Sequence, residues 1–62
     1  MTIIQEIEQL RRTRGLNMLM LCNALMLSSE SEYWEIIHNN KKLSTMQKIC
    51  FMDVFRISLK SI

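Results

Sequence analysis

The side chains able to do acid–base or covalent chemistry are few in this sequence and are widely spaced. His38 is the only histidine, Gly15 is the only glycine, and the cysteines are Cys22 and Cys50. A nucleophile needs a base within hydrogen-bond reach, a phosphate-binding loop needs several glycines, and a metal-binding histidine needs further ligands near it. We therefore expect no enzyme, no cofactor and no metal site, and we assign no role to His38.

The two cysteines lie inside apolar stretches without the paired spacing of a zinc module or a disulfide framework. No cation adjoins either thiol in the sequence, so we expect reduced core thiols of a cytosolic protein. The longest apolar run, residues 18–27, is far shorter than the ~20 residues that cross a bilayer. Glu6 and Glu8 also stand where a signal peptide carries positive charge. These features predict a cytoplasmic protein with no membrane partner.

The composition is typical of one small folded domain. Of the 62 residues, 48% are hydrophobic and 23% are charged. With no proline and one glycine, the chain lacks the turn residues that a β-sandwich or barrel requires. A chain of this length buries only about 60% of the surface that it exposes when unfolded. We expect a single all-α domain over residues 1–62 whose stability as a monomer is marginal.

Three capping boxes and the spacing of apolar residues predict four helices. Residues 2–5, 29–32 and 44–47 each place a serine or threonine three residues before a glutamate or glutamine. Gly15 can end the first helix in the left-handed conformation, and Asn17 can cap the second. The expected helices are residues 3–14, 18–26, 29–39 and 45 to nearly 62.

The last predicted helix has two apolar stripes. One stripe is Met46, Ile49, Cys50, Val54 and Ile57, and the other is Phe51, Met52, Phe55, Leu59 and Ile62. A four-helix chain of this size can bury one stripe, so the other is a candidate interface. We expect a homodimer or an obligate hetero-complex, with dimerisation residues Met46, Ile49, Val54 and Ile57.

Several short segments resemble the lambda-repressor/Cro-like (Xre-type) helix-turn-helix family. They are Leu10-Arg11, Arg14-Gly15-Leu16, Leu21, Leu25, Leu27-Ser28, Tyr33-Trp34, Ile36 and the stretch Asn40-Lys41-Lys42-Leu43-Ser44, within about residues 7–57. The resemblance implies a compact four-helix domain in which residues 29–39 form the recognition helix for the DNA major groove. It also implies that Lys41 and Lys42 contact phosphates, and we add Ser31 and Asn39 to the DNA-binding set.

The chain departs from the family pattern where DNA reading depends on it. Met18, Leu19 and Met20 stand early in the second helix, where the family has polar or charged residues. The turn has one extra residue, and Met26 replaces its usual glycine. The expected recognition helix carries three glutamates and no lysine or arginine, and the net charge is only +2. Carboxylates facing a polyanion lower affinity unless each finds a donor on a base.

Two functions compete on this scaffold. The first is a phage-, prophage- or plasmid-type regulator that binds another regulatory protein such as a repressor, as an antirepressor does. Its partner-binding residues would be Met18, Leu19, Met20, Glu32 and Glu35. The second is a Cro-like dimeric repressor that binds operator DNA directly. The surface chemistry favours the first, and a purely structural helical subunit is a third alternative if the resemblance is accidental.

Overall fold

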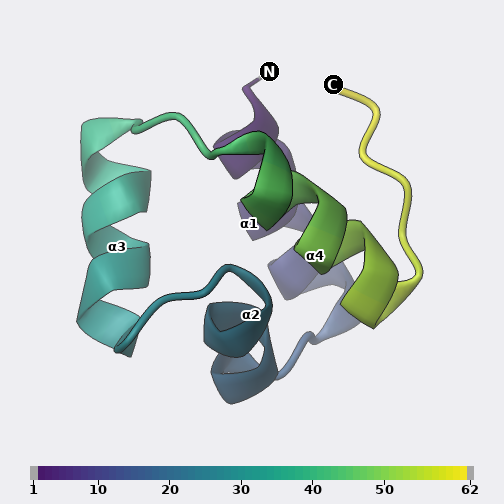
Figure 1. Cartoon of the computed structure of the whole chain (residues 1–62), viewed down its shortest axis with the longest axis horizontal. Helices are drawn as coiled ribbons and strands as arrows, with labels where there is room; N and C mark the ends of the chain where they lie inside the picture. Colours follow the sequence, from purple (N-terminus) through teal and green to yellow (C-terminus); the bar gives the residue numbers. More distant parts are fainter. Residues whose placement is uncertain (1, 62) are drawn as a thin grey trace.

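The computed structural model describes residues 2–61, and that part of the chain is all-helical with no strand. Its helices are α1 (Ile3–Arg14), α2 (Met18–Ala24), α3 (Glu30–Asn39) and α4 (Thr45–Phe55). In Figure 1, α3 stands along one edge of the molecule, α4 lies in front of α1, and α2 is at the bottom. The molecule measures 24 × 23 × 22 Å. The predicted all-α, four-helix domain is confirmed.

The bounds of α1 are those that the sequence predicts. The Thr2 hydroxyl accepts the backbone N–H of Gln5, and the Gln5 side chain accepts the backbone N–H of Thr2, which completes a capping box. At the other end Gly15 has φ +62°, the left-handed conformation that closes a helix. Arg14 and two further arginines in the last turn complement the helix dipole.

The second helix ends earlier than predicted. It was expected to reach Met26, but α2 ends at Ala24, and Met26 has φ +58°. A side chain in this left-handed region costs roughly 1–2 kcal/mol, a strain that a glycine would avoid. The connection to α3 covers residues 25–29, which is longer than the 3–4-residue turn of a helix-turn-helix motif.

The predicted capping box at the start of α3 does not form. Ser29 is the N-cap residue, but its side chain makes no cap hydrogen bond. Its φ is −156°, whereas the working caps Thr2 and Ser44 have φ of −77° and −72°. The backbone at Ser29 is thus more extended than at those two caps. Glu32 instead accepts both the backbone N–H and the hydroxyl of Ser28.

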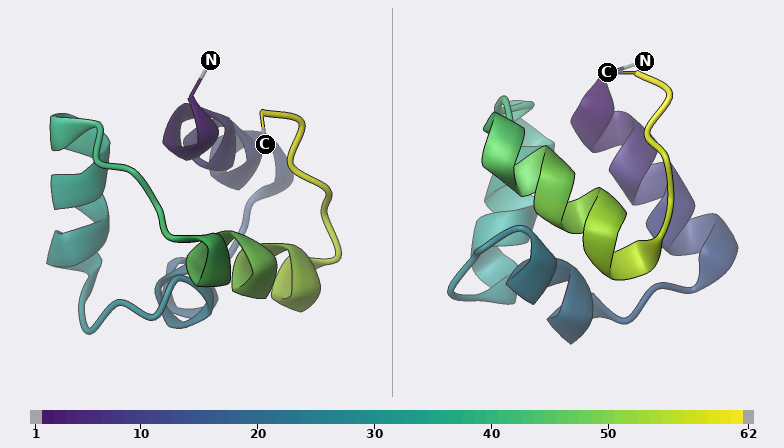
Figure 2. Two further views of the ribbon diagram at one scale, coloured as in Figure 1. Left: turned by 45° about the horizontal axis from the view of Figure 1, so that its top comes forward. Right: turned by 45° about the vertical axis from the view of Figure 1, so that its right-hand side comes forward.

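The last helix also ends well before its predicted limit near Ile62, which itself lies outside the described residues. Arg56 has φ +57°, and the chain turns back after Phe55. The C-terminal segment then runs back past α4 to the start of α1 (Figure 2). The Glu6 carboxylate accepts the backbone N–H groups of Lys60 and Ser61 at 2.7 and 2.8 Å. These bonds satisfy two backbone N–H groups of the non-helical segment.

The core draws on all four helices and the C-terminal segment. Its fully buried side chains are Tyr33, Phe51, Ile7, Leu21 and Leu25. Around them pack Ile4, Cys22, Leu43 and Leu59. The stripe of α4 that contains Phe51 is therefore the buried one.

The other stripe of α4 contains Met46, Ile49 and Val54, and all three are exposed. Ile57, the fourth residue of the predicted dimerisation set, lies apart from them. The helix ends at Phe55, so Ile57 lies in the C-terminal segment, where it is half-buried against the core.

Candidate interaction surface

The buried carboxylate of Glu8 joins α1 to α3. Its Oε1 accepts a 2.6 Å hydrogen bond from the hydroxyl of Tyr33, which is fully buried. Arg11 donates to both carboxylate oxygens, at 2.7 and 2.8 Å, and Arg12 donates to Oε2 at 2.9 Å. Two arginines one turn along the same helix thus neutralise a carboxylate that lies against the core.

Electrostatics keeps this cluster ionic. The hydrogen bonds from Arg11 lower the pKa of Glu8 to about 2 against the opposing effect of burial, with further help from Tyr33 and Arg12. Burial, followed by the hydrogen bond to Glu8, raises the pKa of Tyr33, so the phenol stays protonated. The Arg11 guanidinium also lies 5.3 Å from the centre of the Trp34 ring, a cation–π distance. α3 is therefore held firmly in place.

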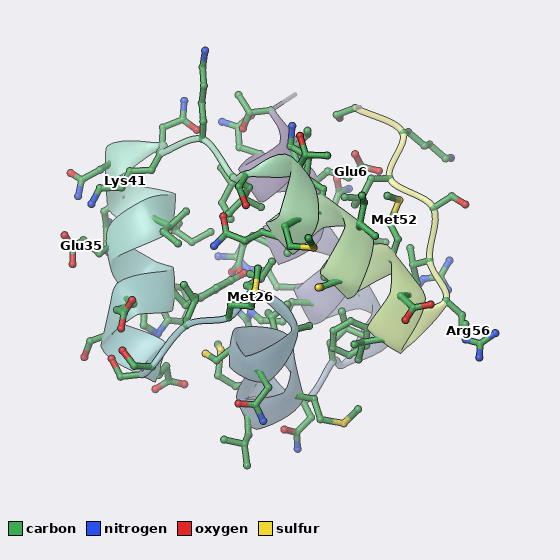
Figure 3. All side chains as sticks on the ribbon, viewed as in Figure 1. Glu6, Met26, Glu35, Lys41, Met52 and Arg56 are labelled. Carbon is green, nitrogen blue, oxygen red and sulfur yellow. The ribbon has the colours of Figure 1, made fainter. Side chains whose placement is uncertain are left out.

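Three of the cations near α3 are bound by carboxylates of the same molecule. Arg11 and Arg12 both bind Glu8. Lys41, an expected phosphate contact, lies 3.2 Å from Glu35, and both residues are on the outer side of α3 in Figure 3. A DNA phosphate at this lysine would meet the carboxylate of Glu35 beside it.

The structure spreads the expected DNA-binding residues over the length of α3 and the loop after it. Ser31 and Asn39 are both exposed, but they lie at opposite ends of the helix, about 12 Å apart along its axis. Lys41 and Lys42 are exposed in the loop that follows Asn40. Between the two ends the surface of α3 is acidic, through Glu32 and Glu35.

The expected partner-binding residues of α2 divide into two kinds. Leu19 is 72% exposed and Met20 is 49% exposed. Met18 is half-buried and packs against the core, so its main contribution is packing within the molecule. Of the two expected acidic residues, Glu35 is exposed, whereas Glu32 is half-buried and bonded to Ser28.

Leu19 borders a shallow hollow of about 300 Å³ between α2 and the start of α3, which Glu30 also lines. Cys22 lies beneath it, buried, and its thiol is 3.8 Å from the Ser29 carbonyl oxygen. Burial raises the pKa of this thiol, and the nearby Glu30 and Glu32 raise it further. The hollow therefore offers apolar contact beside the carboxylate of Glu30. Glu30 is the contributor that the sequence reasoning did not assign.

The described residues hold no cluster of histidine, cysteine, aspartate or glutamate that could bind a metal ion. His38 is exposed in the last turn of α3. None of the helices described here is long and apolar enough to cross a membrane. Comparisons with protein-family models, curated protein sequences and solved structures found no match to this chain.

Proposed function

We propose that this chain is a small cytoplasmic transcription-regulatory protein of phage, prophage or plasmid type that acts by binding another regulator, in the manner of an antirepressor. The observation that carries the proposal is the surface around Leu19. Two large apolar side chains, Leu19 and Met20, are exposed on α2, and the hollow beside Leu19 is bordered by the carboxylate of Glu30.

The energetics of this surface favour a protein partner. Burial of each apolar side chain is worth about 1.5–3 kcal/mol. The hollow beside Leu19 can receive an apolar side chain of the partner, and Glu30 can pair with a cation next to it. The carboxylate of Glu30 also repels nucleic acid, which binds proteins chiefly through neutralisation of its phosphates.

The helix-turn-helix part of the proposal is supported by the order of the helices and by the turn after α2. α2 contacts α3, and α3 follows it after residues 25–29, a connection somewhat longer than the usual turn of this motif. Met26 stands where the lambda-repressor/Cro-like family has a glycine, and it has the left-handed backbone that glycine favours. A protein descended from that family would keep the left-handed turn after its glycine had been replaced by methionine.

A Cro-like repressor that binds operator DNA is the second candidate. α3 stands at the edge of the molecule, and the views agree that no other helix covers its outer side (Figures 1 and 2). Lys42 forms no ion pair with any residue of the described chain. Such binding would rest on few phosphate contacts, so it would be weak and sensitive to salt.

Two double variants separate these functions. Leu19→Lys with Met20→Glu alters the apolar surface, and Lys41→Gln with Lys42→Gln removes the expected phosphate contacts. Each is compared with the unaltered chain for capture of a regulator from the native host and for mobility shift of the neighbouring intergenic DNA. An adaptor loses capture in the first variant alone. A direct repressor loses the mobility shift in the second, and that result would overturn the adaptor proposal.

A further inference from the structure

α4 has an exposed stripe along its whole length. Met46, Ile49, Cys50 and Asp53 recur at the spacing of one helix face, and we refer to these four residues as the α4 face. Met46 is 60% exposed and Ile49 is 52% exposed, while Cys50 is half-buried and Asp53 is exposed. Phe51, on the opposite side of the helix, is fully buried.

The apolar surface continues from the α4 face onto the end of α2. The side-chain N–H of Gln47 donates to the carbonyl oxygen of Leu25 at 2.8 Å, which holds the start of α4 against the end of α2. Met26 follows Leu25 and is 55% exposed. Figure 3 shows its side chain beside α4, on the side that faces the viewer.

The charges within α4 complement its own dipole less well than those of α1 do, although the C-cap residue Arg56 supplies a cation beyond the last turn. A helix favours acidic groups at its start and basic groups at its end, and α1 follows this rule, with Glu6 in its first turn and three arginines in its last. α4 has no acidic residue in its first turn and no basic residue in its last. Its one carboxylate, Asp53, lies near its C-terminal end and forms no ion pair within the described chain.

We propose that the α4 face binds the α4 face of a second copy of this chain, with the two helices antiparallel about a two-fold axis close to Cys50. In this arrangement Asp53 of each copy lies over the first turn of the other copy's α4, where the positive end of the dipole has no acidic residue of its own. Ile49 packs against Cys50 of the second copy. Each contact forms twice, as in any two-fold interface.

This pairing is independent of the proposed function, because it uses neither Leu19 nor Met20. The pairing also predicts how far apart the cysteines of the two copies lie. Two packed helices have axes about 8–10 Å apart, so the Cys50 thiols of the two copies would face each other across the axis, within reach of a short cross-linker. Cys22 is buried in the core and would take no part.

The first test treats the full-length chain, reduced and at micromolar concentration, with a short bismaleimide. We expect a covalent dimer that is lost in Cys50→Ser and kept in Cys22→Ala. A dimer detected by sedimentation but not cross-linked through Cys50 would place the second copy elsewhere and overturn the proposal. A chain that sediments as a folded monomer even at millimolar concentration would do the same.

The second test changes the charges at the two ends of α4, with substitutions that should leave the helix folded. Asp53→Lys and Thr45→Glu each place a charge at the end of α4 that its own dipole favours, so neither variant should lose helical content by circular dichroism. In the antiparallel dimer, Thr45→Glu places a carboxylate near Asp53 of the second copy, and Asp53→Lys places a cation near the positive end of the second copy's α4. Each variant should therefore weaken dimerisation about tenfold. The double variant restores an attractive pair and should recover the dimer. Single variants with an unchanged dissociation constant would rule out this register.

Discussion

The Tyr33 hydroxyl donates to the Glu8 carboxylate across 2.6 Å, and this hydrogen bond joins residues that are 25 positions apart in the sequence. Glu8 lies on α1 and Tyr33 on α3, so the bond fixes the helix that carries Glu30, the acidic part of the proposed surface. Because Arg11 and Arg12 bind the same carboxylate, a single buried group serves three donors. The stability of the domain should therefore depend strongly on it.

We expect Glu8→Gln to lower the free energy of unfolding by about 2–4 kcal/mol, because it removes the charge that both arginines pair with next to the core. Tyr33→Phe should cost about 1–2 kcal/mol, since it removes the hydroxyl and leaves Glu8 with its arginine donors. Urea denaturation followed by circular dichroism measures both. The matched control is Glu35→Gln, which breaks an exposed ion pair with Lys41 and should cost less than about 0.5 kcal/mol.

The pH dependence of stability should follow the same carboxylates. The pKa of Glu8 falls from an ordinary value of 4.5 to about 2 on folding. Burial opposes ionisation of Glu6, but the N–H groups of Lys60 and Ser61 outweigh it, so the pKa of Glu6 is also lowered. The unfolded chain then binds protons more readily than the folded one as the pH falls. Stability should be constant above about pH 5 and decline down to about pH 2.

The Glu8→Gln variant provides the check on this pH dependence. Glu8 should account for a loss on the order of 2–3 kcal/mol across that window. In the variant this part of the decline disappears, although the variant is less stable at neutral pH. An unchanged acid transition in Glu8→Gln would show that other carboxylates control it.

Backbone strain at Met26 offers a route to stabilisation. The residue has φ +58° and an exposed side chain, so Met26→Gly relieves strain at little cost in packing, and we expect a gain of about 0.5–1 kcal/mol. Gly15→Ala is the reciprocal control, because Gly15 has φ +62° and an added Cβ would meet nothing within 4 Å. It should cost about 1 kcal/mol from the backbone alone. Thermal unfolding of the two variants should thus shift in opposite directions.

The parts of the fold that were predictable from the sequence are those fixed by near neighbours in the chain. Both bounds of α1 follow from Thr2, Gln5 and Gly15, whose interactions span a few residues. The end of α4 was predicted wrongly because apolar spacing continues beyond Phe55. The chain instead turns at Arg56, and the N–H of Lys60 then bonds to Glu6, 54 residues away. No local pattern records such a contact.

Only part of the candidate surface could be predicted from the sequence, because some of its contacts also depend on how the chain folds. Leu19 and Met20 could be singled out because apolar residues stand where the resemblance places exposed ones. The ion pairs of Arg11 and Arg12 with Glu8 were not predicted, although a carboxylate three and four residues before two arginines is a local signal for them. The ion pair between Lys41 and Glu35 depends on how the chain turns after α3, and the spacing of the two residues in the sequence does not determine that turn.

The surface around Leu19 makes the most direct prediction about function. Leu19 is 72% exposed and Met20 is 49% exposed, so replacing them by Lys and Glu removes little burial within the molecule. We expect the helical content and thermal midpoint of this double variant to stay close to those of the unaltered chain. Leu21→Ala, at a fully buried position on the same helix, should instead cost about 2–5 kcal/mol.

The same double variant should abolish complex formation with the regulator, because it removes the apolar contact and places a cation where the partner's cation would bind beside Glu30. Co-purification and inhibition of the regulator's operator binding measure this loss. Unfolding of the variant would show that Leu19 and Met20 support the core. A folded variant that still inhibits the regulator fully would show that the partner does not bind through Leu19 and Met20, and would overturn the proposed surface.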